Sequence, residues 1–120
     1  MKRDMELVRS ILRDIAESED GVSAEALADA EHPRALVAYH FEIMDEAGLI
    51  HATLKRAWDG QYVIATADSL TWEGNDLLAA LSSEKVWTEV KRRVGKTLGD
   101  VSVSTLKALA VKVATDFLTT

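Results

Sequence analysis

The dipeptide Asp59-Gly60 is the feature that most restricts the fold of this chain. It is a strong signal for a two-residue β-hairpin loop, because Asp and Gly readily adopt the positive φ angles that such a loop needs. The segments 49–54 and 61–67 on either side have the composition of short strands. The sequence therefore predicts one hairpin in the middle of the chain.

Pairing across this loop decides which face of the hairpin each side chain occupies. With only Asp59 and Gly60 in the loop, Arg56 faces Val63 across the hairpin, and Leu54 faces Ala65. Side chains alternate across a strand, so a one-residue shift in pairing moves every residue to the other face. The predicted register turns Leu54 and Val63 toward the helices, and it leaves two apolar residues on the opposite face, Tyr62 and Ile64.

Apolar residues elsewhere recur at spacings of three and four, which is typical of amphipathic helices. Ser23 and Thr71 are expected N-caps, and Gly48 is an expected left-handed C-cap. Predicted helices cover residues 4–17, 24–30, 33–47, 71–81, 84–96 and 104–118. The chain is thus expected to be mainly α with a small β-hairpin, an α+β fold.

Composition restricts the possible chemistry. The chain has 120 residues and no cysteine, which excludes a disulfide framework and thiolate metal sites. It has no glycine-rich phosphate loop and no G-x-S-x-G motif, and its three histidines, His32, His40 and His51, lack metal-ligand spacing. His40 lies on an apolar stripe and is expected to be a core histidine bonded through one ring nitrogen. We expect no catalytic residues, no metal and no cofactor.

The charge and the apolar runs of the chain indicate which binding partners and which cellular location to expect. The net charge is −6, and residues 1–60 carry 13 acidic against 7 basic side chains. Nucleic-acid binders usually present a basic face, because phosphate contacts supply most of their non-specific affinity. No apolar run approaches the ~20 residues that span a bilayer. A cytoplasmic location without membrane contact is expected.

Three blocks of sequence resemble known families. Residues 37–50, ending in Glu46-Ala47-Gly48-Leu49-Ile50, resemble the recognition helix and following turn of ArsR-like repressors. Residues 70–74 resemble the L-T-x-x-G that opens the helix after the wing in MarR- and PadR-like proteins. With the start at residues 1–5, these blocks resemble an uncharacterised family of small bacterial and phage or prophage proteins, classed as a domain of unknown function. The resemblance implies a winged helix-turn-helix followed by two C-terminal helices, and no established activity. We expect the winged helix at residues 1–81 and the helical extension at 82–120.

The winged-helix resemblance suggests a surface for double-stranded DNA. Acidic residues at the outward positions of the third helix, Glu42, Asp45 and Glu46, would repel phosphate. The alternative is that the hairpin cations are ordinary solvated charges and that the nearby tryptophan caps the core. Residues 91–96 hold a second basic cluster, for which a solvated helix face is favoured. The candidate DNA-binding residues are Arg34, Tyr39, Lys55, Arg56 and Trp58.

The last predicted helix carries an apolar stripe at heptad spacing. We expect it to pack first on the preceding helix, through the valines at 86, 90 and 94, and the remainder to form a homodimer. The alternative is that the stripe folds back on its own chain. The stripe consists of Val103, Leu106, Ala110, Val113 and Phe117. The sequence thus indicates a non-enzymatic binding module, either a DNA-binding transcriptional regulator or a module that binds an unidentified protein.

Overall fold

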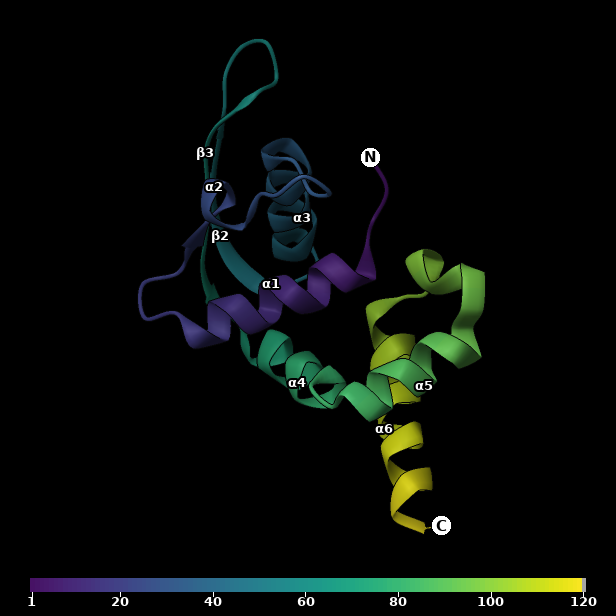
Figure 1. Cartoon of the computed structure of the whole chain (residues 1–120). Helices are drawn as coiled ribbons and strands as arrows, with labels where there is room; N and C mark the ends of the chain where they lie inside the picture. Colours follow the sequence, from purple (N-terminus) through teal and green to yellow (C-terminus); the bar gives the residue numbers. More distant parts are fainter. Residues whose placement is uncertain (120) are drawn as a thin grey trace.

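The computed structural model describes residues 1–119, and it confirms the α+β class, with helices predominating (Figure 1). The order of helix, short strand, short helix, helix and hairpin is consistent with a winged-helix arrangement. The elements are α1 (Met5–Glu17), β1 (Val22–Ser23), α2 (Ala24–Leu27), α3 (Arg34–Glu46), β2 (Ile50–Arg56), β3 (Tyr62–Leu70), α4 (Trp72–Leu81), α5 (Glu84–Val94), the 3-10 helix η1 (Gly95–Asp100) and α6 (Val103–Thr119).

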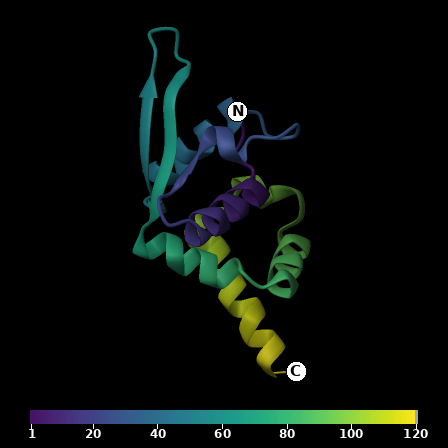
Figure 2. The ribbon, with the colours of Figure 1, turned by 60° about the vertical axis from the view of Figure 1, so that its left-hand side comes forward.

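The three strands form one antiparallel sheet in the order β1-β3-β2. The hairpin of β2 and β3 extends well beyond the helices, which lie on one side of it (Figure 2). The opposite face is uncovered, and Thr53, Lys55 and Ile64 on it are exposed. The sequence missed β1, whose two residues pair with Thr66 and Ala67. Strand β1 runs directly into α2, where the side chain of Ser23 caps the helix as predicted.

The predicted hairpin register is correct from Ala52 to Lys55, and it is off by one residue both at the tip and at the base, where Ile50 pairs with Leu70. Leu54 pairs with Ala65 as expected, but Arg56 pairs with Tyr62 instead of Val63. The loop has three residues, because the N–H of Ala57 donates to the carbonyl of Gln61 at 2.8 Å. Such loops combine a turn with a left-handed residue, which here is Gly60 at φ +86°.

The longer loop shifts the pairing by one residue, and a bulge at Val63 shifts it back. Because a one-residue shift exchanges the two faces, Tyr62 turns toward the helices. Val63 is 55% exposed, so the expected burial of Val63 is wrong. This correction bears on the candidate binding surface, because it brings Tyr62 to the side of α3, the side on which the predicted register already placed Arg56.

The tail packs back on its own chain. Leu106, Ala110 and Val113 are completely buried, because α6 packs against α4 and α5. Dimerisation through these three residues would require the chain to give up these contacts. Val103 and Phe117 at its two ends are half-buried. Exposed apolar residues of α6 lie instead at Val111 and Leu118. Homodimerisation and the domain boundary at residue 81 both remain predictions.

Buried His40 connects α3 to the start of α1. Its Nδ1 lies 2.9 Å from the carbonyl of Leu36, and its Nε2 accepts the N–H of Asp4 at 2.8 Å. Both ring nitrogens are therefore used, where the sequence predicted one. Burial holds the pKa of His40 below its usual value, although the bond to Leu36 acts in the opposite direction. The ring is neutral in the folded chain, with its proton on Nδ1.

We expect the stability of the chain to fall as the pH drops below about 6.5, the ordinary pKa of histidine. Below that pH the unfolded chain takes up a proton at His40 that the folded chain resists, so protonation favours unfolding. One proton can contribute a slope of at most ~1.4 kcal/mol per pH unit. Urea unfolding between pH 5 and pH 8 measures this slope. His40→Gln should reduce it, whereas exposed His51→Gln should not. Equal slopes in the two variants would contradict the assignment.

Candidate binding surface

A groove of about 490 Å³ separates the first half of α3 from the hairpin. Arg34, Ala35 and Tyr39 line it from the helix, and Arg56 and Tyr62 line it from the strands. Three of the five predicted site residues, Arg34, Tyr39 and Arg56, therefore share one groove. The tip of the hairpin, residues 59–61, and the N-terminal Met1 complete its wall.

Arg34 at the start of α3 is fixed on two sides. Its Nε forms an ion pair with the carboxylate of Glu25 in α2. Its Nη1 donates to the carbonyl of Tyr62 at 2.6 Å. The hydrogen bond from Arg34 is the main reason that the pKa of Glu25 lies below its ordinary value. Arg34 thus holds α2 and the hairpin against α3, and its charge is already neutralised.

Arg56 is held in the same way by Glu42 of α3. Its Nη2 lies 2.5 Å from a carboxylate oxygen of Glu42 and 2.6 Å from the hydroxyl of Tyr62. That hydroxyl donates to the same Glu42 oxygen at 2.5 Å, and the guanidinium lies 4.4 Å from the centre of the tyrosine ring. Burial, and then the bond to Glu42, raise the pKa of Tyr62 to about 12. The hydrogen bonds from Tyr62 and Arg56 lower the pKa of Glu42.

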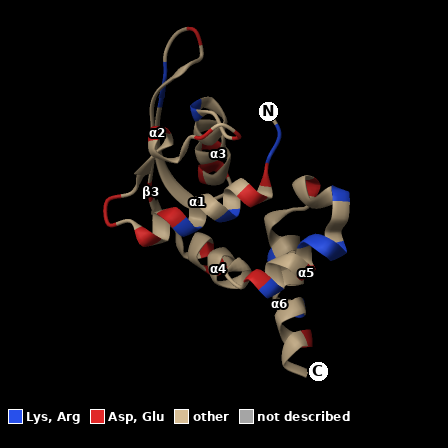
Figure 3. Cartoon of the chain, in the orientation of Figure 1, with Lys and Arg blue, Asp and Glu red and all other residues tan. Residues whose placement is uncertain are grey.

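The other two predicted residues lie outside the groove. Lys55 is on the uncovered face of the hairpin, opposite Ile64. Trp58 is 99% exposed at the tip, so the alternative that it caps the core is wrong. Acidic and basic residues both occur along α3 and the hairpin, and the basic positions do not follow one another in a continuous run (Figure 3).

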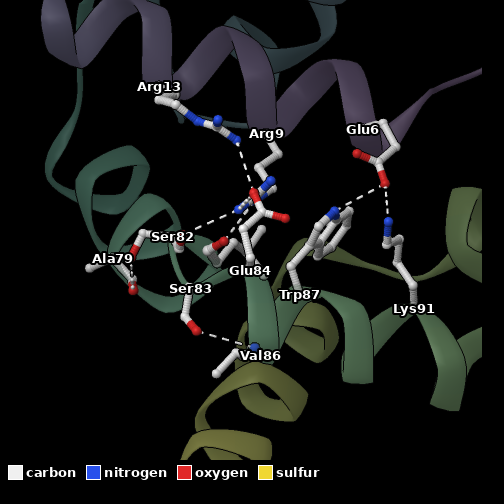
Figure 4. Close-up of polar contacts among 11 residues, drawn as sticks. Glu6, Arg9, Arg13, Ala79, Ser82, Ser83, Glu84, Val86, Trp87 and Lys91 are labelled. Atoms are coloured by element: carbon white, nitrogen blue, oxygen red, sulfur yellow. Dashed lines mark hydrogen bonds and ion pairs between the residues drawn. The ribbon is translucent and has the colours of Figure 1, made fainter.

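A second polar cluster joins α1 to the beginning of α5 (Figure 4). Arg9 is only 4% exposed, although its sequence position lies off the apolar stripe of α1. It donates to the carbonyl of Leu81 at 2.7 Å and forms an ion pair with Glu84 at 2.9 Å. Nearby, the carboxylate of Glu6 accepts from the indole N–H of Trp87 at 3.0 Å. This cluster fixes the tail to α1.

The basic residues 91–93 are largely engaged within the chain. Lys91 pairs with Glu6 at 2.6 Å, and Arg92 donates to Glu89 at 2.7 Å. Arg93 reaches both Glu89 and Asp116 of α6. Arg92 and Arg93 are also exposed, which agrees with the interpretation of the cluster as a solvated helix face. Within residues 1–119, no three His, Asp or Glu side chains are grouped closely enough to hold a metal ion. Nor does any helix in that range combine the length and apolarity that crossing a bilayer requires.

Comparison with known proteins supports the part of the resemblance that points to a domain of unknown function. The family described as "Hypothetical protein (DUF2513)" matches residues 2–99. A Haemophilus influenzae protein, described only as "Uncharacterized protein", is 31% identical over 120 residues, which cover 98% of this chain and 99% of the relative. No solved structure matches the chain. The chain therefore belongs to the DUF2513 family, a family defined by a domain of unknown function.

Proposed function

We propose that this chain is a non-enzymatic binding module that holds a protein partner at the tip of its hairpin. The observation that carries the proposal is the exposure of Trp58, which is 99% exposed on a hairpin extending away from the helices. Tryptophan buries a large area and is enriched among the residues that dominate protein interfaces. Val63 and Ile64 of β3 are exposed apolar residues on the same hairpin.

Charge supports a protein partner over duplex DNA. Affinity for DNA comes largely from cations that are free to neutralise phosphates. Arg34 and Arg56 are paired with glutamates, and Lys55 points away from their groove. The exposed acids Asp45 and Glu46 near the end of α3 would repel a phosphate backbone.

Duplex DNA is the second candidate, favoured by the winged-helix-like order of the elements. In such an arrangement α3 would enter the major groove and the hairpin would contact the backbone. Arg34 and Arg56 would then have to exchange their glutamate partners for phosphates. A transcriptional regulator of this kind would bind weakly at physiological salt.

Photo-crosslinking from the hairpin tip tests the protein-binding proposal. A photoreactive amino acid replaces Trp58 in the full chain, produced in the organism from which the sequence comes. The matched control carries it at Trp72, which is 80% exposed at the start of α4. We expect one discrete protein adduct from position 58 that survives nuclease treatment and is absent from position 72. Adducts that are the same from both positions, or that nuclease removes, would contradict the proposal.

A further inference from the structure

A second hollow, of about 290 Å³, shares Tyr39 as a lining residue with the groove between α3 and the hairpin. It is bounded by α3, the first turns of α1 and the start of α6. Its floor is apolar and almost inaccessible to water, and Ile43 and Val103 form a half-buried rim. The floor residues are Met5, Val8, Met44 and Leu49. The polar side chains in its wall are Tyr39 and Arg3.

The edge of this hollow is positively charged. The Nε and Nη2 of Arg3 donate to the carbonyl of Gly99 at 3.0 and 2.7 Å, and Nη2 also donates to the carbonyl of Val101 at 2.7 Å. The guanidinium is therefore fixed in place by neutral oxygens. No ion pair formed within residues 1–119 involves Arg3, so its charge is not cancelled by a carboxylate.

Arg3 and Gly99 also line an adjoining hollow of about 340 Å³. Lys2, Lys96 and Asp100 form the rest of its wall, so three cations face one carboxylate. Lys2 and Lys96 are exposed and take part in no ion pair with the part of the chain that the structure describes. An apolar hollow thus opens beside a hollow with excess positive charge, and one arginine borders both.

We propose that the apolar hollow binds a small amphipathic carboxylate. Its apolar body would lie between α3 and α6, and its carboxylate would lie at Arg3, facing Lys2 and Lys96. The volume of 290 Å³ lies at the lower limit of small-molecule pockets, which favours a single ring or a short alkyl chain. Such a body would remove the apolar floor from contact with water, which favours binding. Guanidinium groups match carboxylates in geometry and charge. This site is separate from the hairpin tip and does not depend on a protein partner binding there.

Methionine methyl signals report directly on this site. The chain has three methionines, of which Met5 and Met44 line the apolar hollow, whereas Met1 borders the hairpin groove. We expect octanoate, added to the full chain labelled at its methionine methyls, to shift the signals of Met5 and Met44 saturably. The signal of Met1 should stay in place. Octanol should bind about tenfold more weakly, because it lacks the charge-assisted contact.

Filling the hollow should abolish these shifts. Val103→Trp places a large ring at its rim, and Val111→Trp is the control, since Val111 is exposed on the same helix and lies outside the lining. If Val103→Trp fails to fold, Ala47→Phe at the exposed end of α3 blocks the same hollow. Loss of the octanoate shifts in the filled variant alone supports the site. No saturable shift in the unmodified chain, equal binding of octanol, or unchanged binding in the filled variant would overturn it.

Discussion

Arg9→Ala is expected to lower the free energy of unfolding by about 2–4 kcal/mol, because it removes charge-assisted hydrogen bonds and buried packing together. Arg9 donates to the carbonyls of Leu81 and Ser82, at 2.7 and 3.2 Å, where α4 ends. Its guanidinium also lies 5.6 Å from the centre of a ring of Trp87 (Figure 4). Alanine would remove this partner from the buried carbonyl of Leu81. Urea unfolding, followed by far-ultraviolet circular dichroism, measures the loss.

Arg13→Ala is the matched control for this prediction. Arg13 lies one turn further along α1 and approaches the same Glu84 carboxylate at 4.0 Å. Its side chain is about half exposed, so the pair is screened by water and should contribute less than ~0.5 kcal/mol. Similar losses in the two variants would mean that the buried bonds of Arg9 do not hold the tail to α1.

Gly74→Ala is expected to destabilise the chain by about 3 kcal/mol or more, since overpacking a tight backbone contact is costly. A Cβ on Gly74 would lie 1.9 Å from the carbonyl oxygen of Leu49. That carbonyl also accepts the N–H of Thr71 at 3.0 Å, so neither backbone segment is free to move away. Helix propensity alone would make Gly74→Ala stabilising by ~1 kcal/mol. A loss of stability would therefore show that the backbone contact outweighs helix propensity.

Glu73→Ala, at the exposed neighbouring position, controls for changes in helix propensity in the same turn. We expect it to change the free energy of unfolding by less than ~0.5 kcal/mol. The two variants can be compared by the urea concentration at the midpoint of unfolding, if the dependence of the unfolding free energy on urea has the same slope in both. A Gly74→Ala chain that is as stable as the unmodified chain would show that α4 does not pack this tightly on the turn between α3 and β2.

Elements governed by local pattern were predictable from the sequence. The first helix was expected at residues 4–17 and is found at Met5–Glu17, with Asp4 as its N-cap. The apolar spacing and the capping residues that define a helix lie within a few positions of one another, so a helix can be recognised from a single sequence. The hairpin was also found in its predicted place. The length of the loop at its tip was not predicted correctly, because a two-residue and a three-residue loop differ only in local backbone geometry.

Features that join distant segments were not predictable. Arg9 lies off the apolar stripe of α1, yet it is buried because α4 and α5 meet there, more than 70 positions further along the chain. The contact of Tyr62 with Glu42 depends on the bulge at Val63, which sequence spacing does not reveal. The same holds for the tail. Its apolar stripe was visible in the sequence, but whether α4 or a second chain would cover it was not.

A titration with random duplex DNA tests the central claim that the partner of the hairpin is a protein, and that α3 and the hairpin do not form a DNA-binding surface. The full chain is added to a fluorescently labelled duplex, and anisotropy is followed at several salt concentrations from about 50 to 200 mM, where phosphate contacts have their largest effect. The account predicts no saturable binding at about 150 mM salt, because Arg34 and Arg56 are neutralised by Glu25 and Glu42. Saturable binding that weakens steeply with salt and is lost in Arg34→Ala and Arg56→Ala would contradict it, and would show that duplex DNA is the partner.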